Sequence, residues 1–171
     1  LGELFLRHVT SVRRLLRSVL GPGPDIDDLA QDVFVHVHRS IGQFKGDSKF
    51  GTWLHRLTVN VAISHMRQNQ KRKRLRDGKY EDHPSEQSPP NVHDQVIAKE
   101  MVRRFYEVFH TLTPNRQTAF ALFAIEGLSI AEAAAITNIP SALMKSRIWF
   151  ARRELHKKAG KDPYLSSLLN E

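Results

Sequence analysis

The spacing of apolar residues is helical along almost the whole chain. Apolar side chains recur three and four positions apart, as on one face of an α-helix. No persuasive run alternates apolar and polar residues in the way a half-buried strand does. The pattern therefore predicts an all-α protein, with helices over residues 3–20, 26–41, 50–76, 94–110, 114–127, 129–137 and 142–158.

Signals for helix ends support these boundaries. Glycines and prolines stop the first helix just before Asp25, whose side chain suits the N-cap of the next helix. Pro114 after Thr113 is typical of a first helical position, because proline lacks the N–H that a helix start leaves unpaired. Ser129 and Glu132 have the spacing of a capping box, which predicts a helix start there.

One segment interrupts the helical pattern. Residues 77–94, DGKYEDHPSEQSPPNVHD, are rich in Pro, Ser and acids and poor in apolar residues, which predicts a flexible linker. The linker divides the chain into two small helical domains, residues 1–76 and residues 95–160. Residues 161–171 form a C-terminal extension, which is either a short amphipathic helix or a frayed end.

The net charge of +8 is unevenly spread along the chain. Residues 1–76 carry +8, residues 77–97 carry −4 and residues 98–171 carry +4. Two basic blocks on either side of an acidic connector favour a polyanionic partner. A well-solvated surface is the alternative, and net charge alone does not separate the two.

Composition narrows the class of protein. The chain has no cysteine, which excludes disulfides and thiolate metal sites and fits a cytosolic protein. Hydrophobic residues make up 40% of the chain, enough for folded cores. The apolar runs are too short to span a bilayer, and no basic start followed by an apolar block indicates a signal peptide.

The helix that begins at residue 50 has a polar face without an acid. An apolar stripe from Phe50 to Val61 forms its opposite side. The polar face consists of Thr52, Arg56, Asn60 and Arg67, with Trp53 at its edge. Arginine and asparagine bind phosphates and base edges, and an aromatic ring can stack on an unpaired base. The basic run over residues 65–76 continues this face, which favours a nucleic-acid ligand over plain solvation.

Two helices near the C-terminus, over 129–137 and 142–158, have helix-turn-helix proportions. An apolar stripe from Met144 to Leu155 faces inward on the second helix. Its outward residues are Ala142, Lys145, Ser146, Trp149 and Arg153, with Arg147 and Arg152 beside them. This basic face favours a DNA-recognition helix over a plain helical hairpin. Trp149 and Phe150 either contact DNA or a protein partner, or tuck against a neighbouring helix.

The helix over residues 26–41 carries an acidic stripe that includes Asp28 and Asp32. Carboxylates repel DNA, so this stripe either docks a protein or pairs internally with arginine. His36 and His38 lie on the same helix, two residues apart. Side chains at that spacing point about 200° away from each other. The two histidines therefore cannot share a metal ion without further ligands.

Two long segments resemble bacterial sigma factors. DIDDLAQDVFVHVHRSIGQFKGDSKFGTWLHRLTVNVA resembles region two, and LTPNRQTAFALFAIEGLSIAEAAAITNIPSALMKSR resembles region four. The layout of two regions joined by a short linker is similar to that of the extracytoplasmic-function (ECF) group. The resemblance extends from about residue 4 to residue 158.

The resemblance implies a factor that directs core RNA polymerase to promoter DNA and is not itself an enzyme. It assigns polymerase binding to Asp28, Gln31, Asp32 and Val35. It assigns binding of the minus-ten element to Lys49, Thr52, Trp53, Arg56, Asn60, Arg67, Lys71 and Arg72. It assigns binding of the minus-thirty-five element to Ser141, Ala142, Lys145, Ser146, Arg147, Trp149 and Arg153.

The resemblance implies further properties. The loop over 42–49 would hold a flipped base, and the acidic linker would lie in the polymerase channel. We expect a bacterial cytoplasmic protein with an anti-sigma factor as partner, and with no cofactor or metal. The chain departs from many family members at Ser64, at residues 142–144 and at Phe150, where they carry an acid, Gly-Thr-Val and arginine. Promoter contacts should differ accordingly.

The residues leave two rival functions open. A stand-alone helix-turn-helix regulator would bind duplex DNA without polymerase, as a dimer on a palindrome. A metal-dependent hydrolase would use histidines, for which the candidates are His8, His36, His38, His55 and His65. No His-Glu-x-x-His-like spacing supports that enzyme.

Overall fold

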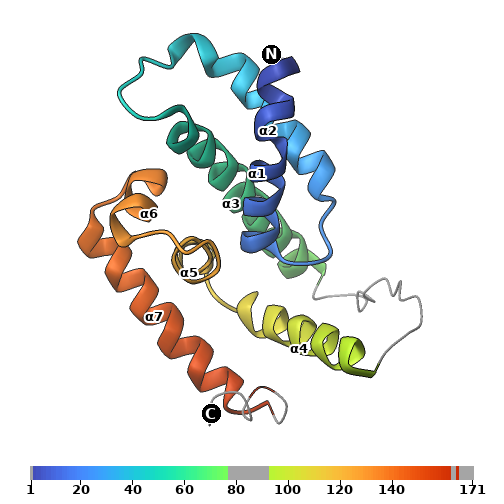
Figure 1. Ribbon diagram of the computed structural model, residues 1–171. Helices are drawn as coiled ribbons and strands as arrows, with labels where there is room; N and C mark the ends of the chain where they lie inside the picture. The colour runs from blue at the N-terminus through green and yellow to red at the C-terminus, as the bar shows by residue number, and fades with distance from the viewer. Residues whose placement is uncertain (1, 77–92, 163–164, 166–171) are drawn as a thin grey trace.

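Helices dominate the part of the chain that the structure describes, residues 2–76, 93–162 and 165, in a computed structural model (Figure 1). No strand occurs among these residues, which confirms the all-α prediction. In chain order the elements are α1 (Gly2–Leu20), α2 (Ile26–Ser40), the 3₁₀ turn η1 (Ile41–Gln43), α3 (Phe50–Arg76), α4 (His93–Phe109), α5 (Pro114–Phe120), the π turn η2 (Ala121–Ile125), α6 (Ile130–Thr137) and α7 (Ser141–Ala159).

The first half of the molecule is a bundle of α1, α2 and α3, each packed against the other two. Its interior is built from the apolar stripes expected from the sequence, with Leu16 of α1, Val33 of α2 and Leu54 of α3 almost fully buried. Each such side chain contributes about 1.5–3 kcal/mol by leaving water. The three stripes therefore account for why these helices form a bundle.

Most predicted helix ends are confirmed. Asp25 caps α2, because its Oδ1 accepts hydrogen bonds from the N–H groups of Asp27 and Asp28 at 3.0 and 3.1 Å. Ser129 and Glu132 form the predicted capping box at the start of α6. Thr113 precedes Pro114 as expected, although its side chain makes no capping hydrogen bond.

The helix predicted over 114–127 is only partly regular. It is α-helical to Phe120 and then continues as the wider π turn η2. The N–H of Glu126 donates to the carbonyl of Ala121, five residues back, at 2.9 Å. Gly127 follows with a positive φ of 70°, a conformation that glycine adopts without strain. The widened turn fixes where the Glu126 side chain leaves the helix.

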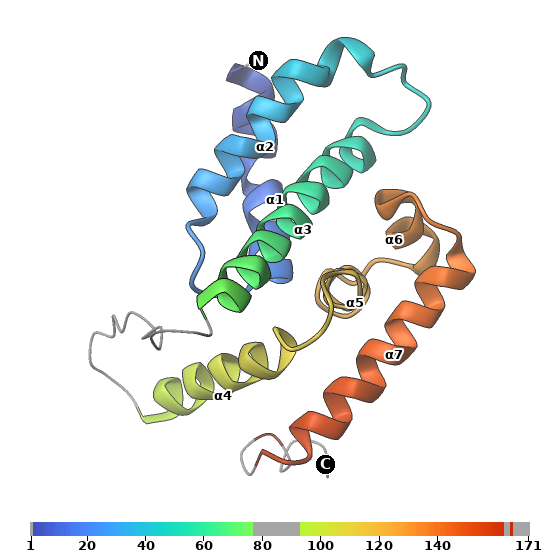
Figure 2. The same ribbon diagram turned by 180° about the vertical axis from the view of Figure 1, so that it is seen from behind.

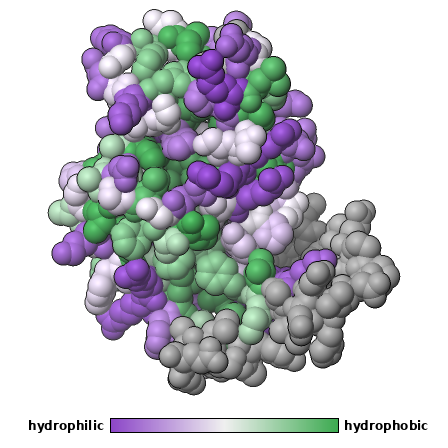
Figure 3. Space-filling view, in the orientation of Figure 1, coloured by the Kyte–Doolittle hydropathy of each residue, from purple (hydrophilic) through white to green (hydrophobic). Residues whose placement is uncertain are grey.

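The second half is built around α5 and α7, which pack closely together. Met144, Ile148, Ala151 and Leu155 of α7 are buried, which confirms the predicted inward stripe. Hydrophobic side chains gather on the surface where α4, α5 and α7 converge, in the lower centre of Figure 3. The Phe105 and Phe109 rings of α4 stack with centroids 5.5 Å apart.

The two halves pack directly against each other. α3 contacts both α5 and α6, and α1 contacts η2 (Figures 1 and 2). One apolar core runs through both halves, from Leu54 and Ala62 to Leu112 and Ala121. The sequence predicted two helical domains but gave no sign that they would share a core.

Other predicted segments are described only in part. The predicted linker, 77–94, lies outside the described residues apart from its last two, which open α4. Leu165, in the C-terminal extension, is buried. Its N–H donates a hydrogen bond to Oδ1 of Asp162 at 3.2 Å. No described helix has both the length and the apolar character that crossing a membrane requires.

Candidate nucleic-acid interface

The polar face of α3 has the composition that the sequence predicted. Thr52, Trp53 and Arg56 are half-buried along its first turns. The remaining predicted residues of this surface are exposed, and they are Lys49, Asn60, Arg67, Lys71 and Arg72. A row of basic and amide side chains thus extends from the loop before α3 to the last turns of the helix.

An aromatic cluster stands at the start of this face. The Trp53 ring lies with its centroid 5.2 Å from that of Phe44 and 5.5 Å from that of Phe50. A hollow of about 230 Å³ opens beside the cluster, lined by Gln43, Phe44, Lys45, Asp47, Ser48, Trp53 and Arg56. A ring wall beside amide, carboxylate and basic groups suits a flat, polar ligand such as a nucleobase.

The sequence predicts a base pocket in the loop over 42–49, and of the loop residues it assigns only Lys49 to DNA binding. The structure brings Gln43, Phe44 and Asp47 of this loop to the hollow. The signal in the sequence was an aromatic residue inside a Gly-flanked polar loop directly before the polar face of a helix. Only the folded loop shows that Phe44 lies against Trp53.

Arg56 already has a partner from the second half. Its Nη2 donates a hydrogen bond to the carbonyl of Ala135, near the end of α6, at 2.9 Å. Its Nε is buried and has no hydrogen-bond partner among the described residues. Hydrogen bonds from Ser129 lower the pKa of Glu132, near the start of α6, and the positive charge of Lys49 lowers this pKa further. The Arg56 hydrogen bond shows that α6 covers part of the α3 polar face.

The outward face of α7 is basic and accessible. Exposed residues of the predicted set are Ser141, Ala142, Lys145, Ser146, Trp149 and Arg153, and Arg147 is half-buried. The short α6, the turn around Asn138 in the left-handed conformation and α7 form the expected helix-turn-helix. The start of α7 and its basic side chains are thus free to enter a major groove.

Trp149 and Phe150 are not buried against a neighbouring helix, although Arg116 of α5 lies over the Phe150 ring. Their side chains are 53% and 41% exposed, and the two rings meet edge to face with centroids 4.9 Å apart. The guanidinium of Arg153 lies 5.3 Å from the Trp149 ring centre, and that of Arg116 lies 5.0 Å from the Phe150 ring centre. The pair is therefore available to a ligand, with arginines held beside it.

The predicted docking face on α2 is exposed as a whole. Asp28, Gln31, Asp32 and Val35 all point outward from the bundle. Asp27 pairs with Arg13 at 2.6 Å, but no ion pair involves Asp28 or Asp32 within the described residues. These two carboxylates thus remain available to a partner, and the alternative of internal pairing finds no support among the described side chains.

The histidines of the rival enzyme hypothesis do not form a metal-binding group among the described residues. His36 and His38 are exposed on α2. Ser11 Oγ lies 3.1 Å from Nε2 of His55, and Asn69 Nδ2 lies 2.9 Å from Nε2 of His65. In the described part of the chain, no three His, Asp or Glu side chains are placed to hold a metal ion.

Two family models match the chain. The model described as Sigma-70 region 2 matches residues 4–72, and the model described as Sigma-70, region 4 matches residues 103–155. The first match contains α1, α2 and most of α3, and the second contains the helix-turn-helix. Each half of the molecule is thus matched separately.

Comparisons with whole proteins agree with these matches. The ECF RNA polymerase sigma-E factor of Haemophilus influenzae is 31% identical to this chain, in a match that covers 91% of this chain and 85% of the relative. The ECF RNA polymerase sigma-E factor of Escherichia coli K12 is 28% identical, in a match that covers 91% of this chain and 84% of the relative.

Solved structures share the fold. CnrH in complex with the cytosolic domain of CnrY gives a TM-score of 0.63 at 25% identity, over 94% of this chain and 88% of that one. The sigma factor RpoE of Bartonella quintana, in complex with the anti-sigma factor NepR, also gives 0.63, at 22% identity, over 94% and 97%. The chain therefore belongs to the ECF sigma factors of bacterial RNA polymerase.

Proposed function

We propose that this ECF sigma factor binds core RNA polymerase and divides promoter recognition between its two halves. The first half docks on the polymerase and opens the minus-ten element, and the second half reads the minus-thirty-five element. The observation that carries this proposal is the polar face of α3, on which Arg56 lines an aromatic hollow, Asn60 follows one turn later, and the helix carries no acid.

The minus-ten surface has the chemistry to hold melted DNA. Exposed basic side chains from Lys49 to Arg72 follow the phosphate backbone, while Asn60 reaches base edges. The hollow beside Trp53 receives one flipped base, whose unstacking costs a few kcal/mol. Stacking on Phe44 or Trp53 offsets that cost, since base–aromatic stacking contributes about 1–3 kcal/mol.

The minus-thirty-five surface is the outward face of α7. Lys145 and Ser146 stand in the first turns of the helix, where a recognition helix contacts base edges. Arg153 lies further along and contacts phosphate. Ala142 in the first turn and Trp149 offer apolar contacts to thymine methyl groups.

Docking on the polymerase uses the outward face of α2. Asp28 and Asp32 present two carboxylates one helical turn apart, with Gln31 and Val35 beside them. This combination of charge and a small apolar contact suits a basic, partly apolar protein surface. The polymerase then supplies the chemistry, so the sigma factor itself is not an enzyme and works in the bacterial cytoplasm.

An anti-sigma factor is the expected inhibitory partner. CnrH, which is 25% identical to this chain, was solved in complex with the cytosolic domain of CnrY. The exposed Trp149 and Phe150 pair is a candidate contact for such a protein, because aromatic residues are enriched at binding hot spots.

Run-off transcription tests the proposed function. It combines bacterial core polymerase, this protein and a pooled library of promoter-like DNA. We expect transcripts that require the protein, and their upstream sequences will give both promoter elements. Duplex binding by the protein alone, without such transcripts, would contradict the proposal in favour of a stand-alone regulator.

A further inference from the structure

A hollow of about 400 Å³ opens where the end of α1 meets the later turns of α3 and the start of the second half. Its volume lies within the range of small-molecule sites in proteins. None of the described residues that line this hollow is acidic. Its polar lining consists of His65, Asn69, Gln70 and Lys73 of α3, with His110 and Gln117 from the second half. A hollow lined by basic and amide groups alone suits an anion.

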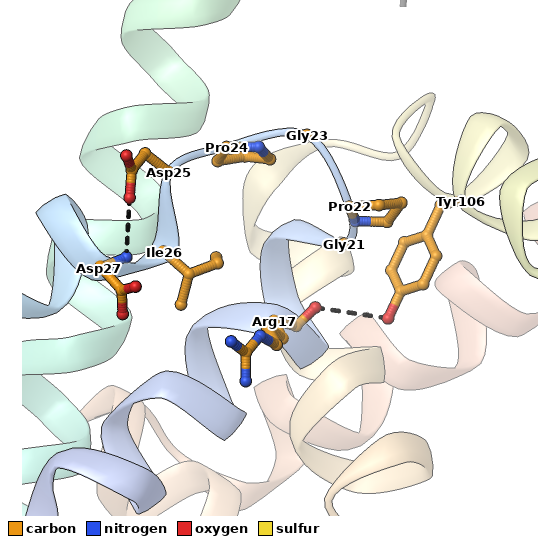
Figure 4. Close-up of a pocket in the computed structure, with 9 residues that line it drawn as sticks. All are labelled: Arg17, Gly21, Pro22, Gly23, Pro24, Asp25, Ile26, Asp27 and Tyr106. Carbon is orange, nitrogen blue, oxygen red and sulfur yellow. Dashed lines mark hydrogen bonds between the residues drawn. The ribbon is translucent and has the colours of Figure 1, made fainter. Parts of the chain in front are cut away.

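A neighbouring hollow has a different charge. It lies beside the turn that follows α1 and has a volume of about 490 Å³ (Figure 4). Arg17 lines this second hollow, but the carboxylates of Asp25 and Asp27 line it as well. An anion there would meet two like charges, whereas the hollow beside α3 presents none from its described lining.

The turn after α1 gives the α3 hollow a fixed wall. The Tyr106 hydroxyl donates to the carbonyl of Arg17 at 3.4 Å, and the Tyr106 ring lies against Gly21 (Figure 4). Gly21 has a φ of +70°, and a Cβ atom there would lie 2.4 Å from this ring, so only glycine allows the approach. Pro22 and Pro24 restrict the backbone of the same turn, and Pro24 lines the hollow. A ligand therefore meets a wall that is already ordered, which lowers the cost of binding.

Both histidines of the hollow are held in place by one hydrogen bond each. Nε2 of His110 donates to the carbonyl of Leu20 at 2.7 Å. Nε2 of His65 accepts from Nδ2 of Asn69 at 2.9 Å. Both contacts can persist when the rings are protonated, because His110 keeps its donor and the Asn69 amide can turn its oxygen to the ring. Each imidazole can thus gain a positive charge without leaving its place.

The charges that act on these two rings are positive. Partial burial lowers the pKa of His65, and the charge of Arg72 lowers it further. Partial burial also lowers the pKa of His110, where the hydrogen bond to Leu20 opposes the effect and the charge of Lys73 adds to it. Among the described residues, no carboxylate pairs with Lys73. An anion in the hollow would relieve this accumulation of positive charge.

We propose that the hollow is a binding site for a small ligand that carries a phosphate group, held by Lys73 and by the imidazoles of His65 and His110. Hydrogen bonds from charged donors to phosphate oxygens are short and strong. The amide of Gln70 supplies a neutral donor, and Met66 gives the hollow an apolar side. Because His110 belongs to the second half and Lys73 to the first, the bound anion joins two groups that repel each other in its absence.

The first experiment measures binding of inorganic phosphate by titration calorimetry. We expect Lys73→Gln to weaken binding at least tenfold, because it removes the permanent charge of the site. Lys71→Gln is the matched control, since it removes the same charge from an exposed position of α3 that does not line the hollow. Equal affinities of the two variants would overturn the proposal.

Adenosine monophosphate in the same titration distinguishes the two sources of the phosphate group. Tighter binding of this ester than of inorganic phosphate would support the site and identify a phosphate ester as its ligand. Tighter binding of inorganic phosphate would support the site and identify the free ion. No measurable binding of either probe would overturn the proposal.

The second experiment tests the imidazoles with sulfate, whose charge is constant between pH 8 and pH 6. An anion raises the pKa of a nearby histidine, so binding should take up protons and strengthen as the pH falls. We expect the affinity for sulfate to rise at least fivefold from pH 8 to pH 6, and to change little in His65→Gln, His110→Gln. The control pair His36→Gln, His38→Gln, exposed on α2, should keep the rise. The same rise in both double variants would overturn the role of the imidazoles.

Nucleic acid is the competing source of phosphate near α3, and a single-stranded oligonucleotide tests it. We expect Lys73→Gln to weaken binding of the oligonucleotide no more than Lys71→Gln does. A loss confined to Lys73→Gln, and as large as its loss of phosphate binding, would assign the hollow to nucleic acid and overturn the proposal of a small ligand. None of these measurements involves polymerase, so their outcome is independent of the proposed function.

Discussion

Single residues carry the proposed contacts with DNA. Arg56 and Asn60 lie one helical turn apart on α3. Arg56 donates a hydrogen bond to the carbonyl of Ala135, whereas Asn60 is exposed. Asn60 is therefore a residue at which the chemistry of the proposed minus-ten surface can be changed with little effect on the fold.

Asn60→Asp should weaken minus-ten recognition. The change places a carboxylate on a face that otherwise lacks acids, where it repels phosphate and cannot donate to a base. We expect transcription from the selected promoter to fall about five- to 150-fold, the equivalent of about 1–3 kcal/mol for one lost base contact. Thr10→Asp adds the same charge at an exposed position of α1 and should leave transcription unchanged. Equal losses in both variants would assign the effect to net charge alone.

At the scale of elements, each surface helix presents one kind of chemistry. α2 turns carboxylates outward and α7 turns basic side chains outward, while both bury an apolar stripe. These outward faces were predicted correctly, because helical periodicity fixes which residues share a face. What each face binds is a proposal that substitution of whole faces can test.

The double variant Asp28→Lys, Asp32→Lys should abolish binding to core polymerase without unfolding the protein. Both carboxylates are exposed, so the helical signal in circular dichroism should persist. The matched control, Glu3→Lys with Glu107→Lys, makes the same change in net charge at exposed acids outside α2. Co-purification with core polymerase is the measurement, and binding retained by the α2 variant would refute the docking role.

The double variant Lys145→Ala, Arg153→Ala should weaken upstream DNA contact. Each lost contact is worth about 1–3 kcal/mol, so promoter occupancy by the holoenzyme should fall at least about tenfold. Lys157→Ala with Lys161→Ala removes the same charge beyond the DNA-facing part of α7 and serves as the control. Footprints of equal strength over the minus-thirty-five element in both variants would contradict the assignment of the recognition helix.

At the scale of the whole molecule, stability should depend on half-buried histidines. Burial lowers the pKa of His55, opposed by Glu126 and assisted by Arg14 and His8. Burial also lowers the pKa of His65, with a smaller contribution from Arg72. Both side chains therefore stay neutral in the folded protein at a pH at which the unfolded chain already binds protons.

This gives the sign of the pH dependence. The free energy of unfolding should be undiminished above pH 6.5, the ordinary pKa of histidine, and should fall as the pH drops below it. His55→Gln keeps a hydrogen-bonding group beside Ser11 and should make this fall shallower in urea denaturation at pH 7.5, 6.5 and 5.5. His156→Gln, at an exposed position of α7, should leave the slope unchanged. An unaltered slope in His55→Gln would contradict the role of burial.

The sequence determined most of the local structure and the family. Helix positions, the Asp25 cap and the capping box at Ser129 depend on residues within a few positions of each other, so periodicity and capping patterns reveal them. The basic face of α7 and the acidic face of α2 follow from the same local rules. These short-range features were enough to predict two helical regions with separate surfaces.

Only the tertiary structure decided how those surfaces meet. The contact of Arg56 with Ala135 joins residues 79 positions apart, and that of Val19 with Gln117 joins residues 98 positions apart. Such pairings leave no period in the sequence. The base hollow also depends on how the loop before α3 folds its Phe44 ring against Trp53. The contact of α6 with Arg56, and the donors that the last carbonyls of α1 find on a distant part of the chain, depend on three-dimensional fit and not on local sequence.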